Sequence, residues 1–200
     1  MNRYQGQHPL NHPNAQPISA SKSSTQDTPA TPPPIPVADP SPYPEISISN
    51  KNLRCAQLLS HDFAAPKSEM STLNQYVYES WVLQADFPEM AAVIKRIAVV
   101  EMHHLYMLGE LITKLGGRPR LQASRPDRQV VWNANMIYYA EKPKQLMRYN
   151  IMIEQKAIQT YTAHQRMISD PCVTDVLARI ILDEQVHVHI FEKFLAEMNG

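Results

Sequence analysis

Apolar residues recur at helical spacing through most of the chain beyond residue 66. In residues 68–83, Glu69, Leu73, Tyr76 and Leu83 follow one another at intervals of four, three and seven positions. Positions with this spacing lie on one face of an α-helix. Residues 68–83 are therefore predicted to form an amphipathic helix whose apolar face includes one carboxylate.

Three further helices follow from the same pattern. They are expected over residues 88–115, which two glycines end, and over residues 143–168 and 172–198, which a short proline-containing turn separates. Residues 118–142 carry charges, prolines and aromatic residues without a sustained helical period, so they are expected to form a long crossover between helices two and three. Two short connections around one long connection predict an all-α four-helix bundle.

The chain before residue 66 has a different composition. The first 50 residues hold 11 of the 17 prolines and few apolar residues. Such a segment buries too little apolar surface to offset the entropy of ordering it, so residues 1–50 are predicted to be a disordered, proline-rich N-terminal tail. Residues 51–65 are weakly amphipathic and are expected to form a short helix or a strap. Residues 66–200 then contain the bundle.

Two of the predicted helices repeat one pair of polar residues within an apolar face. Glu101 and His104 stand three positions apart in the second helix, and Glu184 and His187 repeat this spacing in the fourth. Three positions turn a helix by roughly 300°, so the two side chains of each pair project from nearly the same face, one turn apart. Each pair can bind one metal ion, and two such helices facing each other predict a dinuclear site.

The other two helices each supply a glutamate at the same level. Glu69 lies roughly 25 Å along the helix axis from the first turn, and Glu101 lies roughly 22 Å beyond that turn, at about 1.5 Å per residue. Glu154 and Glu184 match each other in the same way around the second turn. Glu79 lies only roughly 10 Å from the first turn and is therefore not level with the others.

Four carboxylates and two imidazoles would then converge in one buried layer. Burying four carboxylates together without a cation is strongly unfavourable, because they repel one another and lose their hydration. Two divalent metal ions would neutralise this charge, and an oxygen-rich ligand set suits manganese or iron better than zinc. The predicted metal ligands are Glu69, Glu101, His104, Glu154, Glu184 and His187.

The polar residues near these ligands receive other interpretations. Tyr76 and Tyr161 each follow a ligand glutamate by seven positions, on the same helix face. They are expected either to pack in the core with a satisfied hydroxyl, or to act beside the metals by hydrogen-bonding a ligand carboxylate or by supplying an electron or a proton. Glu79 and Glu110 are expected to be solvated. The histidines expected on the surface or beside the ligands, rather than among them, are His103, His164 and His189.

The charge balance narrows the range of partners. Lysine plus arginine (19) equals aspartate plus glutamate (19), which leaves no basic excess to bind nucleic acid or an anionic membrane surface. The sequence shows no signal-peptide core and no membrane-spanning run, and Cys55 and Cys172 make no Cys-x-x-Cys pair. We therefore expect a soluble, cytoplasmic protein without nucleic-acid or membrane partners.

The motifs resemble those of the ferritin-like di-metal carboxylate superfamily over residues 66–198. Ser-Glu-Met-x-x-x-x-Gln-Tyr (68–76) and Val-Glu-Met-His-His (100–104) are similar to the manganese-catalase pattern, and Ile-Leu-Asp-Glu-x-x-His (181–187) is equally similar to rubrerythrin-type diiron proteins. The resemblance implies a ferritin-like fold, and it makes metal ligands of Glu69, Glu101, His104, Glu154 and His187. It makes Glu184 either a sixth ligand or a catalytic acid or base beside the metals.

The function implied is that of a dinuclear manganese or iron oxidoreductase acting on hydrogen peroxide or dioxygen, of manganese-catalase-like or rubrerythrin-like type. Glu101 or Glu154 would bridge the ions, and Glu184 or a tyrosine (Tyr76, Tyr161) would relay protons. Without rubredoxin-like cysteine pairs, a rubrerythrin-like reaction would need an external electron donor. Two alternatives stay open: a ferritin-type iron oxidation and storage protein, and a structural, coat-associated module that the metals only stabilise. A homo-oligomer is expected.

Overall fold

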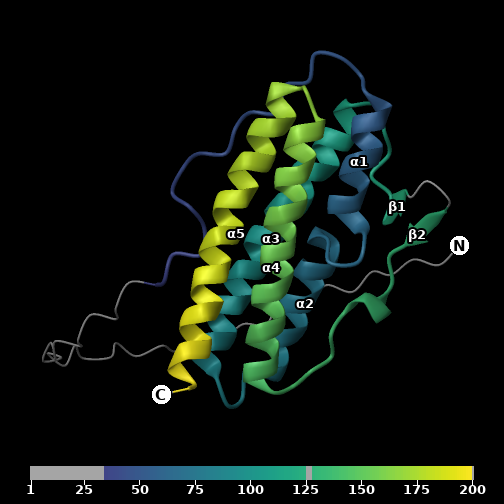
Figure 1. The fold of residues 1–200 in the computed structure, drawn as a ribbon. Coiled ribbons are helices and arrows are strands. Elements are labelled where there is room, and N and C mark those ends of the chain that lie inside the picture. Colours follow the sequence, from purple (N-terminus) through teal and green to yellow (C-terminus); the bar gives the residue numbers. More distant parts are fainter. Residues whose placement is uncertain (1–33, 125–127, 200) are drawn as a thin grey trace, which may run out of the picture. The chain divides into compact units, whose positions relative to one another are not determined.

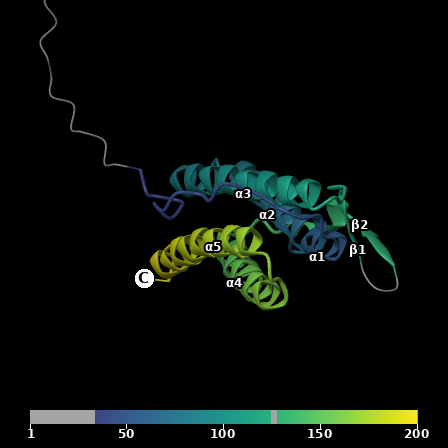
Figure 2. The same ribbon diagram turned by 90° about the horizontal axis from the view of Figure 1, so that it is seen from above.

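Four long helices form the body of the computed structural model, which describes residues 34–124 and 128–199. They are α2 (Glu69–Val82), α3 (Pro88–Lys114), α4 (Pro143–Met167) and α5 (Pro171–Glu197). Helix α2 packs along α3, and α4 packs along α5. Figure 2 shows these two hairpins lying against each other, with α2 and α3 in one layer and α4 and α5 in the other. The four-helix bundle predicted from the hydrophobic pattern is confirmed.

The helix ends agree with the prediction because the local signals are strong. Three of the four helices carry a proline in their first turn, where no backbone donor is needed. The Asp170 side chain caps α5 by accepting a hydrogen bond from the Cys172 amide at 3.0 Å. Helix α3 ends where Gly116 takes a φ of 88°, a conformation that glycine adopts without strain.

The core consists of two apolar clusters with a polar layer between them. One cluster contains the buried apolar residues of α3 from Met107 to Ile112, with Leu115 just after the helix, and the other contains those from Met90 to Ala98. The predicted metal ligands of α3 lie between these two stretches. Leu108 and Ile180 of the first cluster and Ile97 and Phe191 of the second are all fully buried.

The segment between the hairpins contains more regular structure than expected. Residues 118–142 include the antiparallel strands β1 (Gln122–Ser124) and β2 (Gln129–Val131) and the short 3-10 helix η1 (Ala134–Met136). Strand β1 packs beside a fifth helix, α1 (Leu53–Ala64) (Figure 1). Helix α1 settles the alternatives for residues 51–65 in favour of a helix. Asn52 starts it by accepting a hydrogen bond from the Cys55 amide at 3.0 Å.

Residues 35–50 pack on the bundle, and the prediction of disorder up to residue 50 is wrong for this part. Val37 and Ile46 are buried, and the Lys114 ammonium donates a hydrogen bond to the Ile46 carbonyl at 2.5 Å. The segment runs beside α3 and α5 in both views (Figures 1 and 2). These contacts offset the conformational entropy that the segment loses when it is ordered, which the composition alone does not show. Residues 1–33 of the predicted tail lie outside the described residues.

Among the described residues, none of the helices combines the length and apolar character that crossing a membrane requires.

Candidate metal centre

The structure brings the six predicted metal ligands together in the middle of the bundle. Each is at most 3 % exposed. They form two groups, in each of which the donor atoms all lie within 4.8 Å of one another. The first group is Glu69, Glu101, His104 and Glu184, and the second is Glu101, Glu154, Glu184 and His187. Every long helix contributes, so the layer forms only when both hairpins are packed.

Two carboxylates, Glu101 and Glu184, belong to both groups. The remaining members divide evenly, with one glutamate and one histidine on each side. Glu154 belongs to one group only, so its expected alternative role as a bridge between two ions is not supported by the geometry. Glu184 lies among the donor atoms themselves. Of its two expected roles, the arrangement favours that of a sixth ligand.

The imidazoles approach the carboxylates through their Nδ1 atoms. Nδ1 of His187 lies 3.0 Å from both Glu101 Oε1 and Glu184 Oε2. Nδ1 of His104 lies 3.4 Å from Glu184 Oε1 and 3.6 Å from oxygens of Glu69 and Glu101. Two ligands about 2.1 Å from one ion and at right angles are about 3.0 Å apart, so these separations suit donors that share an ion.

Several donor atoms of the centre have no hydrogen-bond partner among the described residues, although they are buried. They are Glu69 Oε2, both Oε atoms of Glu101, His104 Nδ1 and Glu184 Oε1. Buried polar atoms without a partner are costly and call for an explanation, such as a bound ion. Carboxylate and imidazole donors in this number are the ligands that manganese and iron take. The residues present therefore fit a dinuclear metal site.

The electrostatics of the centre favour uptake of positive charge. Burial, followed by the charges of Glu101 and Glu184, raises the pKa of Glu69 and of Glu154 well above the ordinary value. Burial lowers the pKa of the imidazoles, but the carboxylates around His104 and His187 outweigh it and raise the pKa well above its ordinary value. Glu101 shifts the other way, because the effect of its burial is outweighed by His104 and His187, which hold its pKa well below the ordinary value. A metal cation would relieve the same repulsion that protons relieve.

The outer nitrogen of each imidazole is hydrogen-bonded to a group that accepts. Nε2 of His104 lies 2.9 Å from Asp183 Oδ2, and Nε2 of His187 lies 3.0 Å from the Val37 carbonyl oxygen. A carbonyl can only accept, so Nε2 of His187 carries the proton, and in the neutral ring Nδ1 presents its lone pair to the centre. Both rings are thereby oriented as metal ligands require.

These two partners were not predicted from the sequence. Asp183 directly precedes Glu184, and an acidic residue next to a ligand could have suggested it. The Val37 contact is made by a backbone oxygen from a distant, proline-rich segment, for which no sequence signal exists.

The two tyrosines that the sequence singled out hydrogen-bond glutamates of the centre. The Tyr76 hydroxyl donates to Glu154, and the Tyr161 hydroxyl donates to Glu69. Burial first, and the neighbouring carboxylates after it, raise the pKa of both phenols well above 10, so the hydroxyls stay protonated. Both side chains are thus buried in the core with their hydroxyls hydrogen-bonded to predicted ligands. A role in electron or proton transfer stays a prediction.

Glu79 is fully buried, and the prediction that it is solvated is wrong. Its carboxylate accepts hydrogen bonds from Gln75 Nε2 at 2.8 Å and from Asn150 Nδ2 at 2.6 Å. The crossover covers this side of α2, because Gln75 also hydrogen-bonds both backbone groups of Tyr138. Burial, only partly offset by Asn150 and Gln75, raises the pKa of Glu79 to about 7.

The other residues expected outside the ligand set lie outside it. Glu110 is half exposed and pairs with Lys114 at 2.8 Å. His103 and His189 are exposed. His164 is buried, and its Nδ1 lies 2.7 Å from Asp62 Oδ2, away from both groups of donors.

A pocket of about 190 Å³ connects the centre with the surface. Its lining includes Glu69, Glu154 and Glu184 of the centre, together with the exposed Lys67 and Lys156. The lining also includes Ser68, whose buried Oγ has no hydrogen-bond partner among the described residues. The pocket is large enough for a few water-sized molecules. A small polar substrate could therefore reach the carboxylates from this side.

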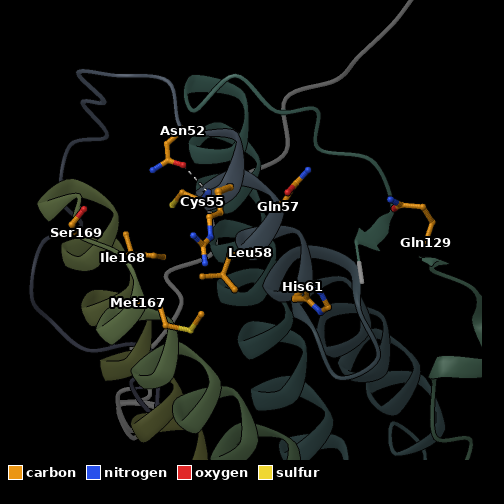
Figure 3. A pocket seen from close by; sticks show the side chains of 10 residues that line it. Asn52, Cys55, Gln57, Leu58, His61, Gln129, Met167, Ile168 and Ser169 are labelled. Carbon is orange, nitrogen blue, oxygen red and sulfur yellow. Dashed lines mark hydrogen bonds between the residues drawn. The ribbon is translucent and has the colours of Figure 1, made fainter. Parts of the chain in front are cut away.

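A larger hollow of about 910 Å³ lies elsewhere on the molecule (Figure 3). It is lined by residues of α1, by Gln129 of β2 and by the connection from α4 to α5 at Ile168 and Ser169. None of the six residues of the centre lines it. Its size alone does not make it the reactive site, because the concentrated buried charge lies in the other pocket.

A family model described as ferritin-like matches residues 64–166, slightly more than half of the chain. The chain belongs to the ferritin-like superfamily. The predicted ferritin-like fold is thus confirmed.

Proteins similar to this ferritin-like chain include a bacterioferritin and a manganese catalase. The bacterioferritin of Desulfovibrio desulfuricans is 27% identical over 147 residues, which cover 72% of this chain and 76% of the relative. A solved structure of that bacterioferritin, described by its diiron site, superposes with a TM-score of 0.59 at 23% identity, covering 73% of this chain and 80% of the other. The structure of KatB, a manganese catalase from Anabaena, superposes with a TM-score of 0.71 at 24% identity, covering 80% of each chain. At these identities the structural likeness shows the fold.

Proposed function

We propose that this protein is a dinuclear manganese or iron oxidoreductase that acts on hydrogen peroxide or dioxygen. The observation that carries the proposal is the pair of donor groups that share Glu101 and Glu184. Shared carboxylates can hold two ions close together, as two-metal catalysis requires. Glu69 with His104, and Glu154 with His187, would complete the coordination on either side.

The metals would supply the redox chemistry, since two neighbouring ions can exchange two electrons with an O–O bond. The chain itself sets the spacing of the carboxylates through four helices and excludes bulk water with the apolar layers above and below. Tyr76 and Tyr161 hold protons on hydroxyl groups directly bonded to Glu154 and Glu69. Each tyrosine is therefore placed to give a proton to a ligand carboxylate or to take one from it.

Peroxide is the substrate that we favour. The pocket of about 190 Å³ that opens on Glu69, Glu154 and Glu184 admits only small molecules, and lysines stand at its rim. The manganese catalase KatB has the same fold at 24% identity. These two facts support a peroxide-handling enzyme.

A second candidate is ferritin-type iron oxidation and storage. It is favoured by the similarity in sequence to a bacterioferritin over 72% of the chain. Storage requires a hollow assembly of many subunits, so the mass in solution separates it from the first proposal. A metal site that only stabilises the bundle would bind metal without turnover.

The test is to load the purified protein separately with manganese and with iron and to add hydrogen peroxide. Oxygen release from the manganese form would establish catalase-like activity. Peroxide loss without oxygen from the iron form, dependent on an added electron donor, would establish a peroxidase. Metal binding with neither peroxide loss nor dioxygen consumption in either form contradicts the proposal.

A further inference from the structure

The segment of residues 35–48, here called the N-terminal strap, reaches the candidate metal centre although it supplies none of the predicted ligands. It contacts the centre at two places, one for each imidazole. The first contact is direct, between the Val37 carbonyl and Nε2 of His187 at 3.0 Å. Both groups are buried, so water does not compete for this hydrogen bond.

The second contact runs through Asp183. The backbone amide of Asp39 donates to Asp183 Oδ1 at 2.7 Å, and the Tyr43 hydroxyl donates to Asp183 Oδ2 at 2.6 Å. The same Oδ2 atom lies 2.9 Å from Nε2 of His104. Two donors from the strap therefore fix the carboxylate that orients His104. Burial, with Asp183 after it, raises the pKa of Tyr43 to about 12, so its hydroxyl remains a donor.

Arg179 holds the strap at this position. Its Nε donates to the Ser41 carbonyl at 2.8 Å, and its Nη2 donates to the Asp39 carbonyl at 2.7 Å. Its Nη1 lies 2.7 Å from Asp183 Oδ1, and the guanidinium stands 4.0 Å from the centre of the Tyr43 ring. One buried cation thus links the strap backbone, the strap aromatic ring and the carboxylate behind His104.

The prolines of the strap lower the cost of ordering it. Pro36, Pro40, Pro42 and Pro44 fix their backbone φ angles and thereby reduce the number of conformations lost on binding to the bundle. The composition that suggested a disordered tail is therefore compatible with an ordered strap once its few polar anchors find partners.

We propose that the N-terminal strap is a positioning element that holds both histidines of the centre in the orientation needed to retain metal. The proposal rests on the metal centre proposed above. Groups that orient a ligating histidine typically change metal affinity by roughly 10- to 100-fold when removed. Coupling of this kind is reciprocal, so bound metal must in turn stabilise the strap.

The first test compares two matched variants of the full chain. Tyr43→Phe removes the hydroxyl that holds Asp183, whereas Tyr78→Phe removes a hydroxyl bonded to the Ala140 carbonyl at 3.2 Å, on the crossover and outside the centre. After metal loading, the rate of metal release to a chelator is measured. We expect Tyr43→Phe to release metal about tenfold faster than the wild type, and Tyr78→Phe to match the wild type.

The second test needs no substitution. Amide hydrogen exchange is compared in the wild type with and without metal. We expect metal to slow exchange of the Asp39 amide, which is bonded to Asp183, by about tenfold. The control is the Asn135 amide on the crossover, which donates to Asn133 Oδ1 at 3.0 Å and should exchange at the same rate with and without metal.

Two outcomes overturn the positioning role of the strap: equal metal release from Tyr43→Phe and Tyr78→Phe, or Asp39 exchange that does not respond to metal. A wild type that binds no metal overturns the proposed centre itself, and its metal content shows this before any variant is compared.

Discussion

Tyr161 on α4 donates a hydrogen bond to Glu69 on α2, across the interface between the two helical hairpins. Tyr76 on α2 donates the matching bond to Glu154 on α4. Each tyrosine follows the glutamate of its own helix by seven positions but bonds the glutamate of the other helix. The two hairpins are thus pseudo-symmetric copies that complete each other's half of the centre.

Replacing either tyrosine by phenylalanine should weaken metal binding on one side of the centre. The glutamate loses the donor that fixes its orientation, so we expect about tenfold weaker retention of one ion in Tyr161→Phe and in Tyr76→Phe. Metal content after dialysis against a chelator measures this. Equal metal content in the wild type and both variants would reduce the two hydroxyls to packing groups.

The pocket beside α4 should control the access of substrate. Thr160 lines the pocket, whereas its neighbour Gln159 is exposed and does not line it. A tryptophan at position 160 fills a space of only about 190 Å³. We expect Thr160→Trp to lower kcat/KM for peroxide at least about tenfold and to leave the metal content unchanged. A tenfold loss in kcat/KM corresponds to a rise of about 1.4 kcal/mol in the free energy of the transition state relative to free enzyme and peroxide. Gln159→Trp is the control, and the same loss in both variants would mean that peroxide does not use this pocket.

Glu79 should make stability depend on pH. Its pKa is about 7 in the folded protein, against the ordinary glutamate value of 4.5 expected for the unfolded chain, so the folded protein holds this proton more tightly and unfolding releases it. This stabilisation is complete below the unfolded pKa and is lost as pH rises through about 7.

Glu79→Gln removes this titration and should keep the fold, because a flipped Asn150 amide can turn its unpaired Oδ1 toward the new amide. Relative to this variant, we expect the wild type to lose roughly 2 kcal/mol of unfolding free energy between about pH 5.5 and about pH 8. Urea denaturation at both values measures the loss. Glu110→Gln, at a half-exposed carboxylate, is the control and should lose as much unfolding free energy between the two pH values as the wild type. If the wild type and Glu79→Gln show the same change in unfolding free energy, Glu79 is ionised at both pH values.

Much of the fold and the meeting of the six residues could be predicted because both depend on periodicity. Helical spacing places Glu101 with His104, and counting from the turns places Glu69 level with them. The environment of Glu79 could not be predicted in this way, since a helical wheel does not show that the crossover covers that side of α2. The strap was missed because its anchors are backbone groups and single polar side chains, which leave no periodic pattern.

The most direct test of the dinuclear centre is the metal content of the manganese-loaded or iron-loaded protein by elemental analysis, compared across three glutamate variants. The wild type should hold two ions per chain. Glu110→Gln, which changes a surface residue on the same helix as Glu101, should hold two as well. Glu69→Gln should weaken the binding of one ion, because Glu69 belongs to only one group of donors. Glu101→Gln should lose both ions, because Glu101 belongs to both groups. A wild type with fewer than two ions per chain, or a Glu101→Gln variant that binds as many ions as Glu110→Gln, would contradict the account.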